Sequence, residues 1–128
     1  MDPGDVATSL LEAFNDGNLD RMRELMDPEM LAWVTDASCA SEPVTGADAC
    51  VARISAMNLP AVRYRVRQTQ SPVAIEDDLI LLMVEVTAER GDRRLNNFAA
   101  HVLRVRAGRV TEWRMADAKR AESDGFWA

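Results

Sequence analysis

The residues best suited to chemistry lie in one stretch near the end of the chain, residues 95–117. This stretch contains the only histidine, His101. Its pattern predicts two strands joined by a tight turn at Ala107-Gly108, and side chains alternate between the two faces of a strand. His101 then shares an apolar face with Leu103. A lone imidazole on an otherwise apolar strand face is the strongest chemical feature of the chain.

Two carboxylates could work with this histidine. Asp117 follows Trp113 at alternating positions, so it can face inward with that side chain. Asp36 stands at the end of an expected strand over residues 30–36, and either carboxylate could act as a catalytic acid or base. Each residue also has a structural interpretation. His101 could be a buried side chain hydrogen-bonded within the protein, Asp36 could turn the chain, and Asp117 could simply end the last strand.

Five further residues could line a ligand pocket beside the histidine. They are aromatic, polar or adaptable side chains on expected strands: Trp33, Tyr64, Asn97, Trp113 and Met115. Asn97 shares the face of the histidine and could orient a ligand. Tyr64 carries a hydroxyl that needs a partner if it is buried. Tryptophan and methionine are also common core residues, so the same side chains could simply fill the interior.

The composition limits the class of protein. With 128 residues, of which 48% are hydrophobic, the chain is expected to form one domain over residues 1–128. The net charge of −6 argues against a nucleic-acid partner, because phosphate binding requires a basic surface. One histidine and two cysteines, Cys39 and Cys50, supply no zinc-ligand set, so no metal or organic cofactor is expected. Without a secretory signal or a membrane-spanning apolar run, we expect a cytoplasmic protein.

Hydrophobic periodicity predicts helices followed by strands. Apolar residues recur at helical spacing in three segments, residues 5–15, 19–26 and 47–57, with Thr45 as the expected N-cap of the third helix. Alternating patterns predict strands over residues 30–36, 62–70 and 79–88, before the hairpin of residues 95–117. Residues 118–128 read as a polar tail. This segregation indicates an α+β domain with a four-stranded antiparallel meander.

The order of these elements, with four local segments, resembles the SnoaL-like family of the nuclear transport factor 2-like, or ketosteroid isomerase-like, superfamily. The segments are LLEAFNDGNLDRMRELMDPEM (10–30), EPVTGADACVARI (42–54), HVLRVRAGRVTEW (101–113) and DGFWA (124–128). The resemblance implies a cone-shaped fold in which three N-terminal helices pack on a strongly curved, mostly antiparallel sheet. It also implies a hydrophobic pocket inside the cone, and a homodimer through the outer sheet face. Apolar side chains expected on that outer face agree with a dimer: Phe98, Ala100 and Val102.

The superfamily includes enzymes with several activities, and the resemblance allows their catalytic residues to be compared with the residues of this chain. His101 resembles the position where ketosteroid isomerases carry the protonated aspartate of their oxyanion hole. A histidine there could donate a hydrogen bond to a developing enolate, or transfer a proton with a pKa near neutrality. Their tyrosine matches Leu10 here, and their catalytic base falls near Val34, two residues before Asp36. Because the tyrosine donor is missing, a true steroid isomerase is disfavoured.

Two other activities match equally poorly. Epoxide hydrolases carry an aspartate where this chain has Met115, and the Arg90-Gly91-Asp92 group lies at an expected hairpin tip, outside any pocket. SnoaL-type cyclases carry an acidic residue near the position of Arg114. The nearest inward-facing carboxylate on this strand is Asp117.

Two hypotheses follow. In the first, the protein is an isomerase, cyclase or dehydratase that transfers protons on a small apolar carbonyl substrate, with His101, Asp36 and Asp117 as catalytic residues. This hypothesis expects His101 to titrate near neutrality, to sit in an open cavity and to lie within proton-relay reach of a carboxylate. In the second, the protein is a non-catalytic ligand-binding or dimerisation module of the same fold, and His101 is structural.

Overall fold

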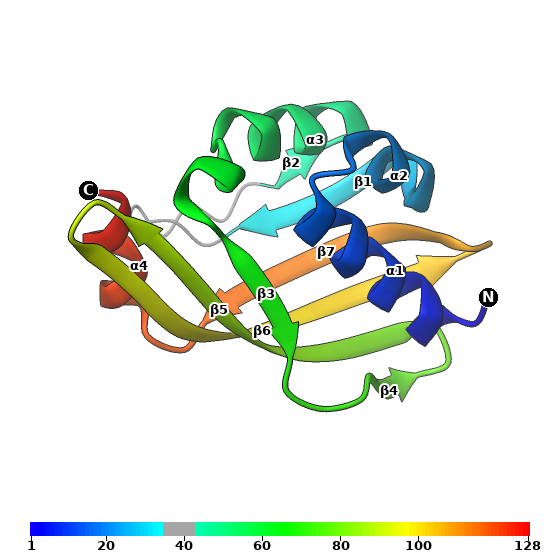
Figure 1. Ribbon diagram of the computed structural model, residues 1–128. Coiled ribbons are helices and arrows are strands. Elements are labelled where there is room, and N and C mark those ends of the chain that lie inside the picture. The colour runs from blue at the N-terminus through cyan, green and yellow to red at the C-terminus, as the bar shows by residue number, and fades with distance from the viewer. Residues whose placement is uncertain (35–42) are drawn as a thin grey trace.

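The computed structural model describes residues 1–34 and 43–128 and consists of one curved sheet with helices over a single face (Figure 1). Three helices lie over that face, and a fourth lies at one end of the sheet. They are α1 (Pro3–Asp16), α2 (Leu19–Leu25), α3 (Ala47–Ala56) and α4 (Arg120–Trp127). The α+β architecture expected from the sequence is confirmed.

Within residues 1–34 and 43–128, the sheet has seven strands in the order β2-β1-β7-β6-β5-β3, with β4 paired to β5 outside this path. They are β1 (Met26–Val34), β2 (Val44–Thr45), β3 (Arg65–Gln68), β4 (Val73–Glu76), β5 (Leu79–Arg90), β6 (Arg93–Arg106) and β7 (Arg109–Asp117). Only β1 and β7 run parallel to each other; the other paired strands are antiparallel. The expected antiparallel meander corresponds to β3, β5, β6 and β7.

The ends of the first two helices follow from local side-chain chemistry. The Asp2 carboxylate accepts a hydrogen bond from the Asp5 amide at 2.9 Å, which satisfies a free N–H at the start of α1. Gly17 ends this helix in the left-handed region, at φ 66°, where glycine is unstrained. Asn18 then caps α2 by accepting a hydrogen bond from the Arg21 amide at 3.0 Å.

The prediction that Thr45 caps α3 is wrong. Thr45 belongs to β2 and pairs with Leu31 of β1. The N-cap is Gly46, at φ 95°, and its own N–H donates to the Met30 carbonyl at 2.7 Å. The chain therefore leaves an edge strand one residue later than the capping pattern indicated, because strand pairing takes precedence over the local cap.

Three elements differ from the sequence expectations. The strand expected over residues 62–70 begins only at Arg65, because Leu59–Val62 forms the 3₁₀-helix η1 with Pro60 in its first turn. Strand β4 was not predicted, since all its residues are exposed and show no alternating burial. The expected polar tail contains α4, in which Phe126 is the buried residue.

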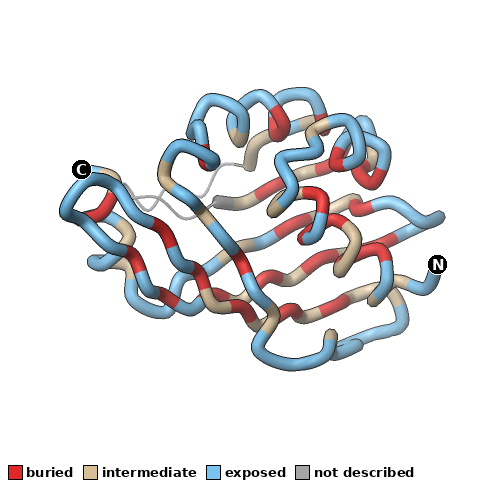
Figure 2. Tube along the Cα trace, viewed as in Figure 1, coloured by how far each residue is buried: buried red, intermediate tan, exposed pale blue. Residues whose placement is uncertain are grey.

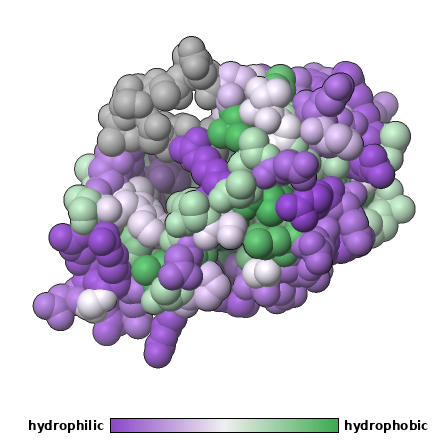
Figure 3. All heavy atoms as spheres, turned by 90° about the horizontal axis from the view of Figure 1, so that it is seen from above, coloured by the Kyte–Doolittle hydropathy of each residue, from purple (hydrophilic) through white to green (hydrophobic). Residues whose placement is uncertain are grey.

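The core lies between the helices and the inner face of the sheet. Burial alternates along β5 and β6, as the period of two in Figure 2 shows. The predicted division of faces is confirmed: His101 and Leu103 are buried, whereas Phe98 on the opposite face is 39% exposed. Seen from above, the exterior is mainly hydrophilic, with hydrophobic residues in small patches (Figure 3). Within residues 1–34 and 43–128, the helices cover the face of the hairpin that carries His101, and the face that carries Phe98 is left open (Figure 1).

Candidate functional site

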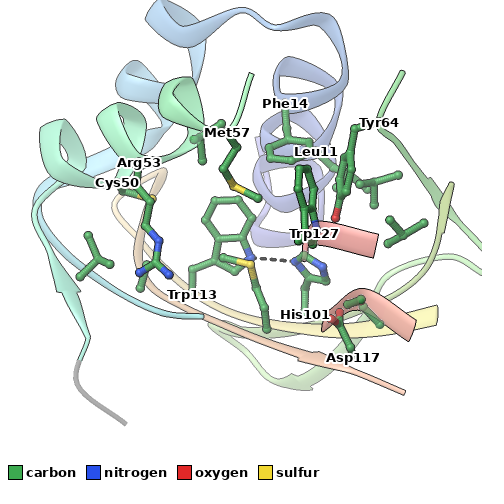
Figure 4. Close-up of a pocket in the computed structure, with 18 of the residues that line it drawn as sticks. Leu11, Phe14, Cys50, Arg53, Met57, Tyr64, His101, Trp113, Asp117 and Trp127 are labelled. Carbon is green, nitrogen blue, oxygen red and sulfur yellow. Dashed lines mark hydrogen bonds between the residues drawn. The ribbon is translucent and has the colours of Figure 1, made fainter. Parts of the chain in front are cut away.

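A cavity of about 540 Å³ lies between the inner face of the sheet, the helices α1 and α3, and the C-terminal helix α4 (Figure 4). Its walls are mostly apolar. Leu11 and Phe14 come from α1, and Trp127 comes from α4. Pockets of this size and lining are typical of sites for small organic molecules.

His101 and Trp113 form a hydrogen-bonded pair on the cavity floor. They lie on the neighbouring strands β6 and β7, and the Trp113 indole N–H donates to His101 Nδ1 at 2.9 Å (Figure 4). Trp113 is 2% exposed and His101 is 8% exposed. Both line the cavity.

This pairing determines the tautomer of the imidazole. An indole N–H is only a donor, so Nδ1 must be the acceptor, and the proton of the neutral ring lies on Nε2. Burial lowers the pKa of His101 to about 4, so the ring is neutral at neutral pH. No residue in the ranges 1–34 and 43–128 hydrogen-bonds the Nε2 edge. His101 therefore offers the cavity a neutral N–H donor, and the expectation that it titrates near neutrality is wrong.

Tyr64 and Asp117 supply further polar groups to the same cavity. Burial, and secondarily the negative charge of Asp117, raise the pKa of Tyr64 to about 12. Its hydroxyl thus stays protonated at neutral pH and can donate a hydrogen bond. Asp117 is exposed and lies at the end of β7, where the strand alternation turns Trp113, Met115 and Asp117 to the cavity, as expected from the sequence.

The structure brings together five of the eight predicted site residues. These are His101, Asp117, Tyr64, Trp113 and Met115. Trp33 instead lies on the other face of β1 from the cavity-lining Ala32, and the Arg114 guanidinium stacks 4.0 Å from the centre of its ring. Asp36 lies outside the described residues.

Asn97 was expected to orient a ligand, but its side-chain amide instead forms hydrogen bonds to residues at the start of α4. The side-chain nitrogen donates to the Lys119 carbonyl at 2.7 Å and to the Ser123 hydroxyl at 2.9 Å. Its oxygen accepts bonds from the amides of Phe98 and Lys119. With 1% exposure and both amide ends engaged, Asn97 holds the C-terminal helix against the sheet.

Two cavity residues were missed by the sequence interpretation. Arg53 lies on α3 in the same stripe as Cys50 and Met57, so its helical spacing could have indicated it. Trp127 lies in the segment expected to be a tail, where no periodicity marks it. The neighbouring Cys50 is no nucleophile, because burial raises the pKa of its thiol to about 11.

The described residues show two further features that bear on function. In residues 1–34 and 43–128, no group of three or more His, Cys, Asp or Glu side chains is arranged to hold a metal ion. In the same ranges, no helix is both long and apolar enough to cross a membrane.

Comparison with known proteins places the chain among similar folds. A protein from a soil-derived mobile gene cassette, Bal32a, shares 21% identity with a TM-score of 0.86, over 98% of this chain and 96% of that one. A protein from Jannaschia sp. CCS1, provisionally assigned as a SnoaL-like polyketide cyclase, shares 16% identity with a TM-score of 0.80, over 98% and 92% of the two chains. An LEH-like epoxide hydrolase from M. tuberculosis shares 15% identity with a TM-score of 0.77, over 98% of this chain and 89% of that one.

These identities are low, so the solved structures establish the fold alone. No protein with a curated function matches the sequence. The sequence itself matches the SnoaL-like domain family over residues 7–113, which is most of its length. The chain is therefore a member of the SnoaL-like domain family.

Proposed function

We propose that this protein binds a small, largely apolar carbonyl compound in the cavity and transfers a proton next to the carbonyl group. The observation that carries the proposal is the neutral imidazole of His101, whose Nδ1 is occupied by Trp113. Its Nε2–H is left to hydrogen-bond a carbonyl oxygen. The apolar walls would hold the rest of the molecule and exclude water.

The proposed step uses two groups of the cavity. The Asp117 carboxylate removes a proton from the carbon beside the carbonyl, and the electron pair of that C–H bond moves to the carbonyl oxygen as an enolate. The His101 N–H stabilises this oxygen, because a donor aimed at developing charge is effective in a site of low polarity. Return of the proton from Asp117 to the same or another carbon completes an isomerisation. The neutral Tyr64 hydroxyl offers a second donor.

A non-catalytic role in ligand binding is the second candidate. It is favoured by one observation: in residues 1–34 and 43–128, the hydrogen-bond partner of His101 is Trp113, and no carboxylate contacts the imidazole. In that role, the same cavity and the same donor hold a carbonyl ligand without reaction.

Propiophenone, a small apolar ketone with exchangeable protons beside its carbonyl, tests both candidates. We expect propiophenone to bind, with its carbonyl infrared band at lower frequency than in an apolar solvent. Propylbenzene lacks the carbonyl and should bind about fivefold more weakly, because a neutral hydrogen bond contributes roughly 1 kcal/mol. The matched variant is His101→Phe/Trp113→Phe. It removes donor and partner together and leaves no buried polar atom unpaired, so it should fold and should abolish the shift.

Proton exchange separates catalysis from binding. If the protein is an enzyme, it accelerates deuterium incorporation beside the carbonyl of propiophenone in heavy water, and Asp117→Asn slows this at least about tenfold. Binding with a band shift but without accelerated exchange would leave the binding role and exclude the catalytic one. An unshifted carbonyl band in the bound wild type would contradict the assignment of His101 in both roles.

We also propose that the outer face of the sheet forms a homodimer. Its centre is apolar and half-buried: Leu81, Met83, Ala100 and Val102 are cross-strand partners on β5 and β6, and Phe98 lies beside them. Because the helices cover only the inner face, a second copy of this surface is the simplest cover for these side chains.

A further inference from the structure

We propose that Arg53 binds an anionic group of the ligand, so that the cavity takes apolar carbonyl compounds that also carry an acid, such as apolar oxo acids. This inference rests on the proposed function and narrows its substrate class. Three observations support it: the position of Arg53, its lack of a partner among the described residues, and the distribution of charge around the cavity.

Arg53 occupies a position on α3 where the helical spacing predicts an apolar side chain. Cys50, Arg53, Ile54 and Met57 are spaced at i, i+3, i+4 and i+7, so they form one face of α3 and the turn that follows it. All four line the cavity. An arginine in this stripe places five N–H donors at the rim of an otherwise apolar wall.

The arginine has no partner within the described protein. Most arginines of residues 1–34 and 43–128 are engaged: Arg23 pairs with Asp48 at 2.8 Å, Arg67 with Glu85 at 2.8 Å, and Arg104 with Asp78 at 2.8 Å. Arg53 forms neither an ion pair nor a side-chain hydrogen bond with any described residue. Its guanidinium is therefore available to a ligand, and guanidinium groups bind carboxylates in a bidentate manner.

The charges around the cavity give such a ligand one orientation. Arg53 and Asp117 lie on opposite sides of the His101–Trp113 pair (Figure 4). Asp124, which also lines the cavity, belongs to α4 rather than α3. An acidic group would be repelled from the aspartate end and attracted to Arg53. The carbonyl of the same molecule would then reach the end that holds His101, Tyr64 and Asp117.

Because of the overall charge of the protein, a preference for an anionic ligand would indicate a local positive group in the cavity. At a net charge of −6, the chain as a whole attracts cations and repels anions. A preference for an anionic ligand over a neutral one of the same shape must therefore come from a local positive group. In the cavity lining, that group is Arg53.

The experiment compares three probes with the same apolar chain: decanoate, decanamide and decylamine. Binding to the full chain is measured by isothermal titration calorimetry at neutral pH and low salt. We expect decanoate to bind roughly fivefold more tightly than decanamide, because an ion pair at a partly exposed site is modest in strength, and decylamine to bind no better than decanamide. Added salt should reduce the decanoate preference, since exposed charges are screened.

Two variants make the comparison specific. Arg53→Gln should bring decanoate and decanamide within about twofold of each other, mainly by weakening decanoate binding. The matched control is Arg65→Gln. Arg65 is exposed on β3, lies outside the cavity lining and has no side-chain partner among the described residues, so this variant loses the same charge and should keep the preference.

The outcomes separate the two proposals. Equal binding of decanoate and decanamide to the wild type, or a preference that survives Arg53→Gln, overturns the role of Arg53 and leaves the apolar cavity as a binding site. A preference for decylamine shows that the aspartates select the ligand instead, and it also overturns this inference. If none of the three probes binds while propiophenone still does, the inference is overturned and the proposed function stands. If propiophenone also fails to bind, both fail.

Discussion

The most informative single group in this protein is an imidazole that does not titrate where histidines usually do. The indole of Trp113 occupies one nitrogen of His101, and burial opposes protonation of the other. A neutral donor at this place suits the stabilisation of a developing enolate better than the transfer of a proton. We therefore propose that Asp117 transfers the proton and that His101 binds the carbonyl oxygen.

The lowered pKa of His101 predicts how stability depends on pH. The unfolded chain has an ordinary histidine pKa near 6.5, whereas the folded value is about 4. Between these values the unfolded state binds a proton that the folded state does not, so the free energy of unfolding falls as the pH drops. The loss should approach about 3 kcal/mol near pH 4 and be absent above about pH 6.5.

Urea unfolding at a series of pH values measures this effect. The carboxyl groups of Asp78 and Glu85 also have lowered pKa values, because arginines bond them, and they add acid sensitivity of their own. The contribution of His101 is therefore read as the difference between the wild type and His101→Phe/Trp113→Phe. Parallel pH profiles for the two proteins would contradict the assigned pKa.

At the scale of elements, the site depends on how α4 is held. This helix carries Trp127, which lines the cavity and lies 6.2 Å from Tyr64 between ring centres. Asn97 holds its start, and the Arg90 guanidinium bonds the carbonyls of its last residues, Phe126 and Trp127. One wall of the cavity is thus attached to β5 and β6 by side-chain hydrogen bonds, in addition to the buried Phe126 side chain.

Replacing Asn97 should loosen this wall selectively. Asn97→Ala leaves the Lys119 amide and carbonyl without their buried partner, at a cost of about 2 kcal/mol. Hydrogen exchange followed by mass spectrometry should show faster exchange in residues 119–128, with the strands protected as before. Asn96→Ala is the control, because this exposed neighbour bonds only Glu85, and its loss should cost less than about 0.5 kcal/mol. Equal protection of α4 in both variants would refute the role of Asn97.

At the scale of the whole molecule, the sheet has one covered face and one open face. The open face combines an apolar centre with charged pairs at its side, including Arg67 with Glu85. We expect two copies to associate through it, with Val102 near the centre. Sedimentation velocity should show a dimer for the wild type and a monomer for Val102→Lys, since burying an unpaired charge opposes association.

The control for this prediction alters charge on the other side of the molecule. Glu12→Gln removes one negative charge from the exposed face of α1, the same change in net charge that Val102→Lys makes on the sheet. It should leave the dimer intact. A monomeric wild type at micromolar concentration would exclude the proposed interface.

The fold was largely predictable because its signals are local. Helical spacing identifies α1, α2 and α3, alternation identifies β5, β6 and β7, and Ala107-Gly108 marks the turn between the last two strands. The failures have two causes. Thr45 pairs with β1 and α4 is held by Asn97 of β6, so contacts with distant strands decide both. β4 pairs with β5, the next strand along the chain, but all four of its residues are exposed and show no alternation.

The sequence by itself determined which strand face of the hairpin enters the interior, because a strand repeats every two residues. That placed His101 with Leu103, and Trp113 with Met115 and Asp117. The tertiary structure alone decided what those residues do. The register between β6 and β7 brings the Trp113 indole to His101, and the position of α4 gives Asn97 a structural role. Hydrogen-bond partners and burial depend on contacts between distant segments, so the pKa and the tautomer of the histidine could be known only once the chain was folded.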